Sequence, residues 1–88
     1  MNKPQQDYPL EFRKRDLAEA IERKTGTSLL YQNGRLMGDK LLRILFAEQK
    51  LIKQLGWTKD LYKGKYKFLG HEARILCRHL KLTKEHFV

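Results

Sequence analysis

The sequence predicts one small α+β domain that is mostly helical, with the order α-ββ(hairpin)-α-β-α. The chain has 88 residues, which suits one domain and is too short for two independent hydrophobic cores. Apolar residues recur at helical spacing in three segments, whereas a two-residue Asn-Gly turn and a stretch of strict alternation indicate extended structure. The compact domain is expected over residues 10–82, after a flexible arm at 1–9 and before a tail at 83–88 that frays.

The first helix is expected over residues 16–25. Asp16 followed by Glu19 is similar to a capping box, and the apolar residues that follow share one helical face. Gly26 suits the left-handed conformation found after many helix ends. Residues 10–15 could extend this helix backwards, because their apolar positions align with its buried face. The sequence alone therefore does not fix the first residue of this helix to within several positions.

A β-hairpin is expected next, because Asn33-Gly34 separates two short apolar runs. A type I′ turn needs positive φ at both central residues, and Asn followed by Gly adopts it at low steric cost. Tyr31 would then face Leu36 across residues 29–37. The alternative is a helix-turn-helix, which is less favoured because Asn-Gly would interrupt its second helix after about a turn and a half.

Two further helices and one strand complete the prediction. The longest helix is expected over residues 40–55, with Asp39 as its N-cap, and its wide apolar stripe needs cover on more than one side. Residues 62–68 alternate between aromatic residues or glycine and lysine, which is typical of a strand with one apolar and one basic face. The last helix is expected over residues 70–82, with three cations on its outer side.

The charge of the chain favours a polyanionic ligand. Nineteen Lys and Arg face ten Asp and Glu, which gives a formal net charge of +9. The sequence therefore predicts a small nucleic-acid-binding protein, for DNA rather than RNA, with an accessory or regulatory role. The alternative is an adaptor or inhibitor that docks its basic face on an acidic partner protein. An adaptor would need an exposed apolar anchor such as Trp57, Tyr31 or Phe87.

The candidate nucleic-acid contacts are cations and aromatic residues in three groups. Lysines interleaved with aromatic rings suit phosphate attraction combined with base stacking, although lysines on an edge strand also discourage aggregation. The cations of the last helix and of the segment before the first helix suit phosphate contacts or, equally, solvated helix faces. The candidates are Lys59, Tyr62, Lys63, Lys65, Tyr66, Lys67, Arg74, Arg78, Lys81, Arg13, Lys14 and Arg15.

No catalytic site, metal site or cofactor is expected. Cys77 is the single cysteine, and its spacing from His71 and His79 does not suit a metal site. No nucleophile motif or phosphate-binding loop occurs, so the chain is expected not to be an enzyme. The apolar runs are too short to span a membrane and the first residues lack a secretory pattern, so a cytoplasmic or nucleoid-associated location is expected. Homodimerisation stays an open alternative, because a small domain without a disulfide gains stability from a partner.

Overall fold

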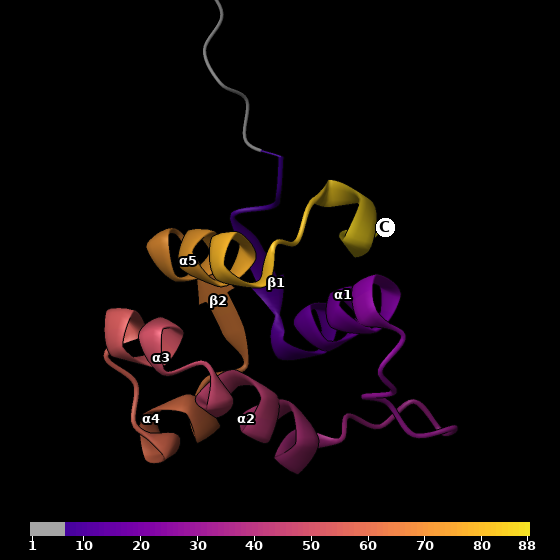
Figure 1. The fold of residues 1–88 in the computed structure, drawn as a ribbon. Helices are drawn as coiled ribbons and strands as arrows, with labels where there is room; N and C mark the ends of the chain where they lie inside the picture. The colour runs from indigo at the N-terminus through magenta and orange to yellow at the C-terminus, as the bar shows by residue number, and fades with distance from the viewer. Residues whose placement is uncertain (1–6) are drawn as a thin grey trace, which may run out of the picture.

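Short helices dominate the computed structural model of this chain, which describes residues 7–88 (Figure 1). The elements are β1 (Glu11–Arg13), α1 (Lys14–Thr25), α2 (Gly38–Ala47), α3 (Gln49–Leu55), α4 (Lys59–Lys63), β2 (Lys67–Leu69), α5 (His71–Leu80) and the 3-10 helix η1 (Lys84–Phe87). Together they form one small domain in which helices surround a two-stranded antiparallel sheet. The α+β class is therefore confirmed, whereas the order of the elements differs from the prediction.

The sheet joins the two ends of the domain. β1 and β2 pair antiparallel, with Glu11 opposite Leu69 and Phe12 opposite Phe68. The two phenylalanine side chains point into the core, and their ring centroids lie 5.9 Å apart. Residues 10–15 were expected to lead into or extend the first helix. They form a strand because their partner comes from the far end of the chain, and no local pattern indicates such a partner.

The start of α1 is built by Arg13 and Asp16. Arg13 is the N-cap, and its backbone N–H donates to the carboxylate of Asp16 over 3.0 Å, so Asp16 lies inside the first turn instead of capping it. The helix consequently begins at Lys14, before the predicted residue 16. Its end is as predicted, because Gly26 adopts the left-handed conformation with φ of 78°.

The chain reverses direction at Asn33-Gly34, but not through the predicted type I′ turn. Gly34 has φ of +86°, whereas Asn33 is not among the described residues with positive φ. The N–H of Gly34 donates to the carbonyl of Tyr31 over 2.8 Å, which is typical of a three-residue loop with a glycine bulge. The pairing therefore shifts by one residue. Leu30, and not Tyr31, lies opposite Leu36 in a single antiparallel bridge.

The helix predicted over residues 40–55 is two helices, α2 and α3, which meet at Glu48. This residue leaves the helical conformation, with φ of −89° and ψ of 84°. Leu45 and Leu51 are both fully buried. Six positions apart on one continuous helix, they would lie about 120° apart around its axis, and the break lets each helix direct its own leucine to the core. Asp39 makes no capping hydrogen bond, because α2 already begins at Gly38.

The strand predicted over residues 62–68 is also wrong over most of its length. Its first two residues belong to α4, whose N-cap Thr58 accepts a hydrogen bond from the N–H of Leu61. Tyr62 is buried against Trp57, with ring centroids 5.6 Å apart. Packing of this ring outweighs the local period of two, and extended structure begins only with β2.

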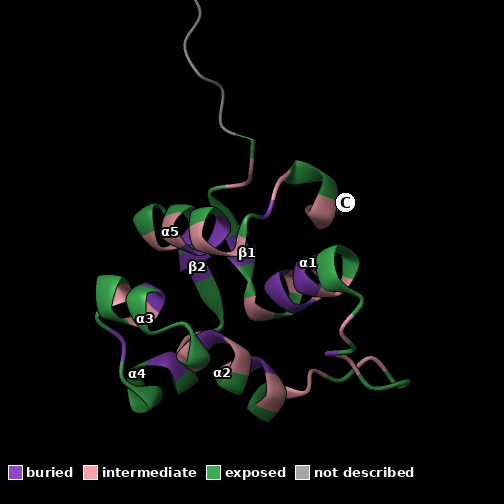
Figure 2. Cartoon of the chain, viewed as in Figure 1, coloured by how far each residue is buried: buried purple, intermediate pink, exposed green. Residues whose placement is uncertain are grey.

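The last helix, α5, matches its prediction closely and covers the sheet. Ala73, Leu76 and Cys77 are buried on its inner face, while Lys81 ends the helix in the left-handed conformation with φ of 56°. Figure 2 shows the same division in the other helices, with buried residues toward the interior and exposed residues outside. None of the helices described in residues 7–88 is long and apolar enough to cross a membrane.

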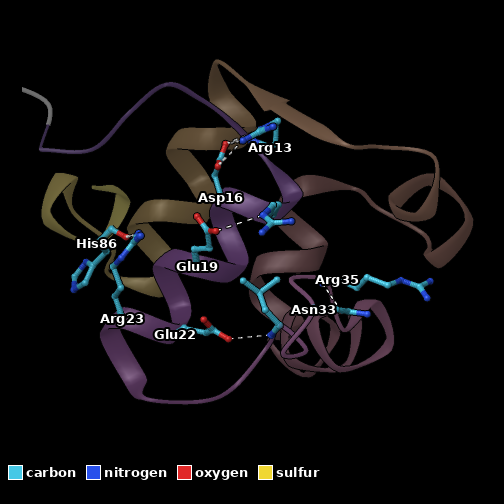
Figure 3. A network of polar contacts seen from close by, with 10 residues as sticks. Arg13, Asp16, Glu19, Glu22, Arg23, Asn33, Arg35 and His86 are labelled. Carbon is cyan, nitrogen blue, oxygen red and sulfur yellow. Dashed lines mark hydrogen bonds and ion pairs between the residues drawn. The ribbon is translucent and has the colours of Figure 1, made fainter.

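Residues 83–88, expected to fray, include the short helix η1 in the structure. Phe87 packs on Phe12, with ring centroids 4.8 Å apart. The carbonyl of His86 accepts a hydrogen bond from the guanidinium of Arg23 over 2.6 Å (Figure 3). Of the arm expected at residues 1–9, residues 1–6 lie outside the described part of the chain.

Candidate nucleic-acid interface

A cavity between α3 and α5 brings several polar side chains together. Its volume is about 330 Å³, and it is lined by Gln54, Arg74, Ile75, Arg78 and His79. The two arginines are separated by one turn of α5, so they lie on the same stripe of that helix. Gln54 comes from α3, which packs directly against α5. The sequence predicted the arginine stripe, and the structure adds the opposing helix that turns it into one wall of a cavity.

The side chains around this cavity offer hydrogen-bond donors and no carboxylate. The Nε2 atom of His79 lies 2.6 Å from the Oε1 atom of Gln54. An amide oxygen can only accept, so the imidazole donates and the amide group of Gln54 keeps its two N–H donors. Among residues 7–88, neither Arg74 nor Arg78 forms an ion pair with an acidic side chain. Both guanidinium groups therefore keep their donors for a ligand.

The exposed charged side chains within α3 and α5 are all cations, whereas Glu48, the N-cap of α3, is acidic and also exposed. Figure 1 shows the two helices next to each other on one side of the domain. We call their exposed cations, together with the residue that ends α5, the α3–α5 face. The residues of this face are Lys50, Lys53, Arg74, Arg78 and Lys81.

The only acidic residue within these two helices, Glu72, does not reduce the charge of this face. Its Oε2 atom accepts a hydrogen bond from the indole Nε1 of Trp57 over 3.1 Å and lies 3.0 Å from the Nζ atom of Lys65. The carboxylate is thus bound on the side of α5 that faces the loop before β2. None of the five cations of the α3–α5 face forms an ion pair with a carboxylate among residues 7–88.

The four candidate lysines between residues 59 and 67 have different surroundings in the structure. Lys59 and Lys63 are exposed on α4. Lys65 is bound to the carboxylate described above, and its ammonium lies 5.8 Å from the ring centroid of an indole. Lys67 lies 2.7 Å from Glu11 on the paired strand, and this hydrogen bond raises the pKa of Lys67. Two of the four lysines are therefore already neutralised within the protein.

The two predicted stacking residues have opposite environments. Tyr62 is only 2% exposed, and its burial raises the pKa of the hydroxyl group. Its ring contacts Phe46 and Trp57 in the core, so it is not accessible to a base. Tyr66 is 72% exposed in the loop before β2. Of the two tyrosines, Tyr66 alone could stack on a base.

The basic segment before the first helix is occupied by contacts within the protein. Arg13 pairs with Asp16 over 3.2 Å (Figure 3), and this hydrogen bond lowers the pKa of Asp16. The ammonium of Lys14 lies 4.0 Å from the ring centroid of Tyr62, and partial burial lowers the pKa of this lysine. Arg15 pairs with a carboxylate one turn further along α1. All three cations thus already make contacts within the protein.

The cysteine and the histidines do not come together. Cys77 is 1% exposed, and burial raises the pKa of its thiol to about 12. Among residues 7–88, no group of three His, Cys, Asp or Glu side chains has the proximity that a metal ion requires.

Residues Lys50, Lys53 and Gln54 are part of this site although the sequence did not single them out. Their helical spacing was visible, and it placed the two lysines on the solvent side of a long helix. The placement of Gln54 across the cavity from Arg74 and Arg78 depends on the break between α2 and α3 and on the packing of α3 against α5. Comparisons of the chain with protein-family models, curated proteins and solved structures find no match.

Proposed function

We propose that this protein binds nucleic acid, with duplex DNA as the main ligand, through the α3–α5 face. The observation that supports this proposal is that two helices in contact carry exposed cations that form no ion pair among residues 7–88. A duplex presents a dense row of phosphates, and each cation that neutralises one phosphate releases condensed counterions. An accessory or regulatory role stays a prediction.

The cations divide into two kinds of contact. Arg74 and Arg78 present planar groups with several donors, which suit phosphate oxygens in a fork. Lys50, Lys53 and Lys81 act as point charges that extend the attractive surface along and beyond the two helices. Contacts of this kind position a protein on a duplex without reading its bases. We therefore expect binding with little sequence preference.

The adaptor alternative has less support, because two of its three expected anchors are packed. Trp57 is 6% exposed, and Phe87 lies against Phe12. Tyr31 is 55% exposed at the hairpin and could still anchor a partner. A pull-down repeated after nuclease treatment separates the two functions. A partner that is lost with the nucleic acid supports the proposal, whereas a protein partner that survives supports the adaptor.

The direct test is the salt dependence of duplex binding, measured by the fluorescence anisotropy of a labelled duplex oligonucleotide. If four or five phosphates are neutralised, the slope of log affinity against log salt is about −3.6 to −4.5 between roughly 50 and 200 mM salt. No association at low ionic strength, or a slope near zero, would contradict the proposal.

Paired variants then locate the interface. Lys50→Gln combined with Lys53→Gln removes two exposed cations of α3 and is expected to reduce the magnitude of the slope by about two. The matched control is Arg35→Gln combined with Lys84→Gln, which removes two exposed cations, on the hairpin and on η1, that do not belong to the α3–α5 face. An equal loss in both pairs would show that total charge, and not the α3–α5 face, determines binding.

A further inference from the structure

The cavity between α3 and α5 is built differently from the rest of the basic surface. Exposed lysines attract anions without fixing them, whereas this cavity surrounds a small volume with side chains from two helices. Arg74 and Arg78 contribute two guanidinium groups from α5, and Gln54 contributes an amide from α3. Ile75, which is half-buried, adds an apolar part to the wall.

The amide of Gln54 is held in one orientation. Its Oε1 atom accepts the hydrogen bond from His79, so its amide group is directed by a contact within the protein. The donor set around the cavity is thus two guanidinium groups and one amide, with no acidic side chain among the lining residues. This set offers more donors than the two oxygens of a carboxylate can use, whereas a phosphate group presents four oxygens.

We infer that this cavity is a discrete binding site for one phosphate group of the nucleic-acid backbone, an assignment that rests on the proposed function and names its central contact. Arg74 and Arg78 supply the two positive charges, and the amide of Gln54 donates to a further phosphate oxygen. His79 is a positioning residue, because it orients the amide without contacting the phosphate.

The first experiment uses inorganic phosphate as the probe, with sodium chloride exchanged for phosphate at constant ionic strength. Side-chain NMR signals of Gln54, Arg74 and Arg78 report on the cavity. We expect saturable shifts of these signals, with dissociation constants in the millimolar range. Shifts that stay linear in phosphate, or that appear equally at lysines across the surface, would overturn the inference.

Two variants, each lacking one positive charge, show whether phosphate binds at a discrete site or is attracted to the basic surface as a whole. Arg78→Gln removes a cavity residue and is expected to weaken phosphate binding about tenfold, as for the loss of one charge-assisted contact. Lys53→Gln removes a neighbouring charge that does not line the cavity, and its effect is expected to stay below about twofold. Both residues are exposed, so neither change is expected to impair folding, which circular dichroism checks. Equal losses in the two variants would overturn the inference.

A duplex titration distinguishes the source of the phosphate and separates this inference from the proposed function. If a backbone phosphate occupies the cavity, the duplex shifts the same signals, and Arg78→Gln reduces the magnitude of the salt slope by about one. Duplex binding that leaves these signals unmoved would overturn the inference and the arginine contacts of the proposed function, while nucleic-acid binding through the lysines would stand. Phosphate binding without any duplex binding would instead refute the proposed function and leave a site for a free phosphate compound.

Discussion

Tyr62 shows how one side chain changes both the fold and the candidate site. Its ring lies in the core, in contact with Phe46 and Trp57, and the ammonium of Lys14 lies 4.0 Å from the ring centroid. Its hydroxyl oxygen is buried and has no hydrogen-bond partner among the described residues. A buried polar group without a partner loses its bonds to water and gains nothing in return. The ring therefore stabilises the domain while its hydroxyl group opposes folding.

We predict that Tyr62→Phe raises the free energy of unfolding by about 1 kcal/mol, because it removes the unpartnered hydroxyl and keeps the ring. Urea denaturation measures the change. Tyr66→Phe is the control, since Tyr66 is 72% exposed and the same substitution there should have little effect. Duplex affinity should be unchanged in Tyr62→Phe, because the residue is not on the surface. Clear destabilisation by Tyr62→Phe would show that the hydroxyl is hydrogen-bonded in solution.

At the scale of elements, the hairpin depends on the backbone conformation of one residue. Gly34 has φ of +86°, and a Cβ atom added there would lie 3.3 Å from the Nη2 atom of Arg15. Side chains adopt this conformation at a cost, whereas glycine adopts it freely. The glycine at position 38 opens α2 without positive φ, and a Cβ atom added there meets nothing within 4 Å.

We predict that Gly34→Ala lowers the free energy of unfolding by about 1 kcal/mol. Gly38→Ala is the matched control and should leave stability unchanged or raise it by about 0.5 kcal/mol, because alanine restricts the unfolded chain and favours the helix. Thermal and urea denaturation of the two variants give the comparison. Equal stability of both variants would mean that position 34 does not need positive φ in solution.

At the scale of the whole molecule, the C-terminal segment is attached to the start of the domain. Phe87 lies against Phe12, and the backbone N–H of Lys84 donates to the carbonyl of Asp7 over 2.8 Å. The guanidinium of Arg23 on α1 reaches the carbonyl of His86. These contacts connect both ends of the described chain to α1 and β1, so local loss of η1 would expose part of the core.

We predict that Phe87→Ala lowers the free energy of unfolding by about 2 kcal/mol, the value expected for removing a partly buried aromatic side chain. Val88→Ala is the control, because Val88 is 85% exposed and its truncation should change stability by less than about 0.5 kcal/mol. Urea denaturation with tryptophan fluorescence measures both. An unchanged stability in Phe87→Ala would support the expectation that residues 83–88 fray.

Local patterns predicted the features that depend on neighbouring residues. Gly26 ends α1 in the left-handed conformation, and α5 has its apolar and basic sides where the periodicity of the sequence places them. Caps, turns and helical faces are decided within a few residues, so the order of the amino acids is sufficient to indicate them. The net charge follows from the composition alone, and the arginine stripe of α5 follows from the helical spacing of its residues.

Features that depend on residues far apart in the chain required the folded structure. Strand β1 forms because β2 reaches it, and Tyr62 leaves the predicted strand because Trp57 and Phe46 enclose its ring. The same holds for charge, since Lys67 pairs with a glutamate from the other strand, while the packing of α3 on α5 brings Gln54 to the arginines of α5. Long-range packing and pairing compete with local preference and outweigh it when they bury more apolar surface. The composition of the chain therefore indicates that it is basic, and only the packed domain decides which of its cations face a ligand.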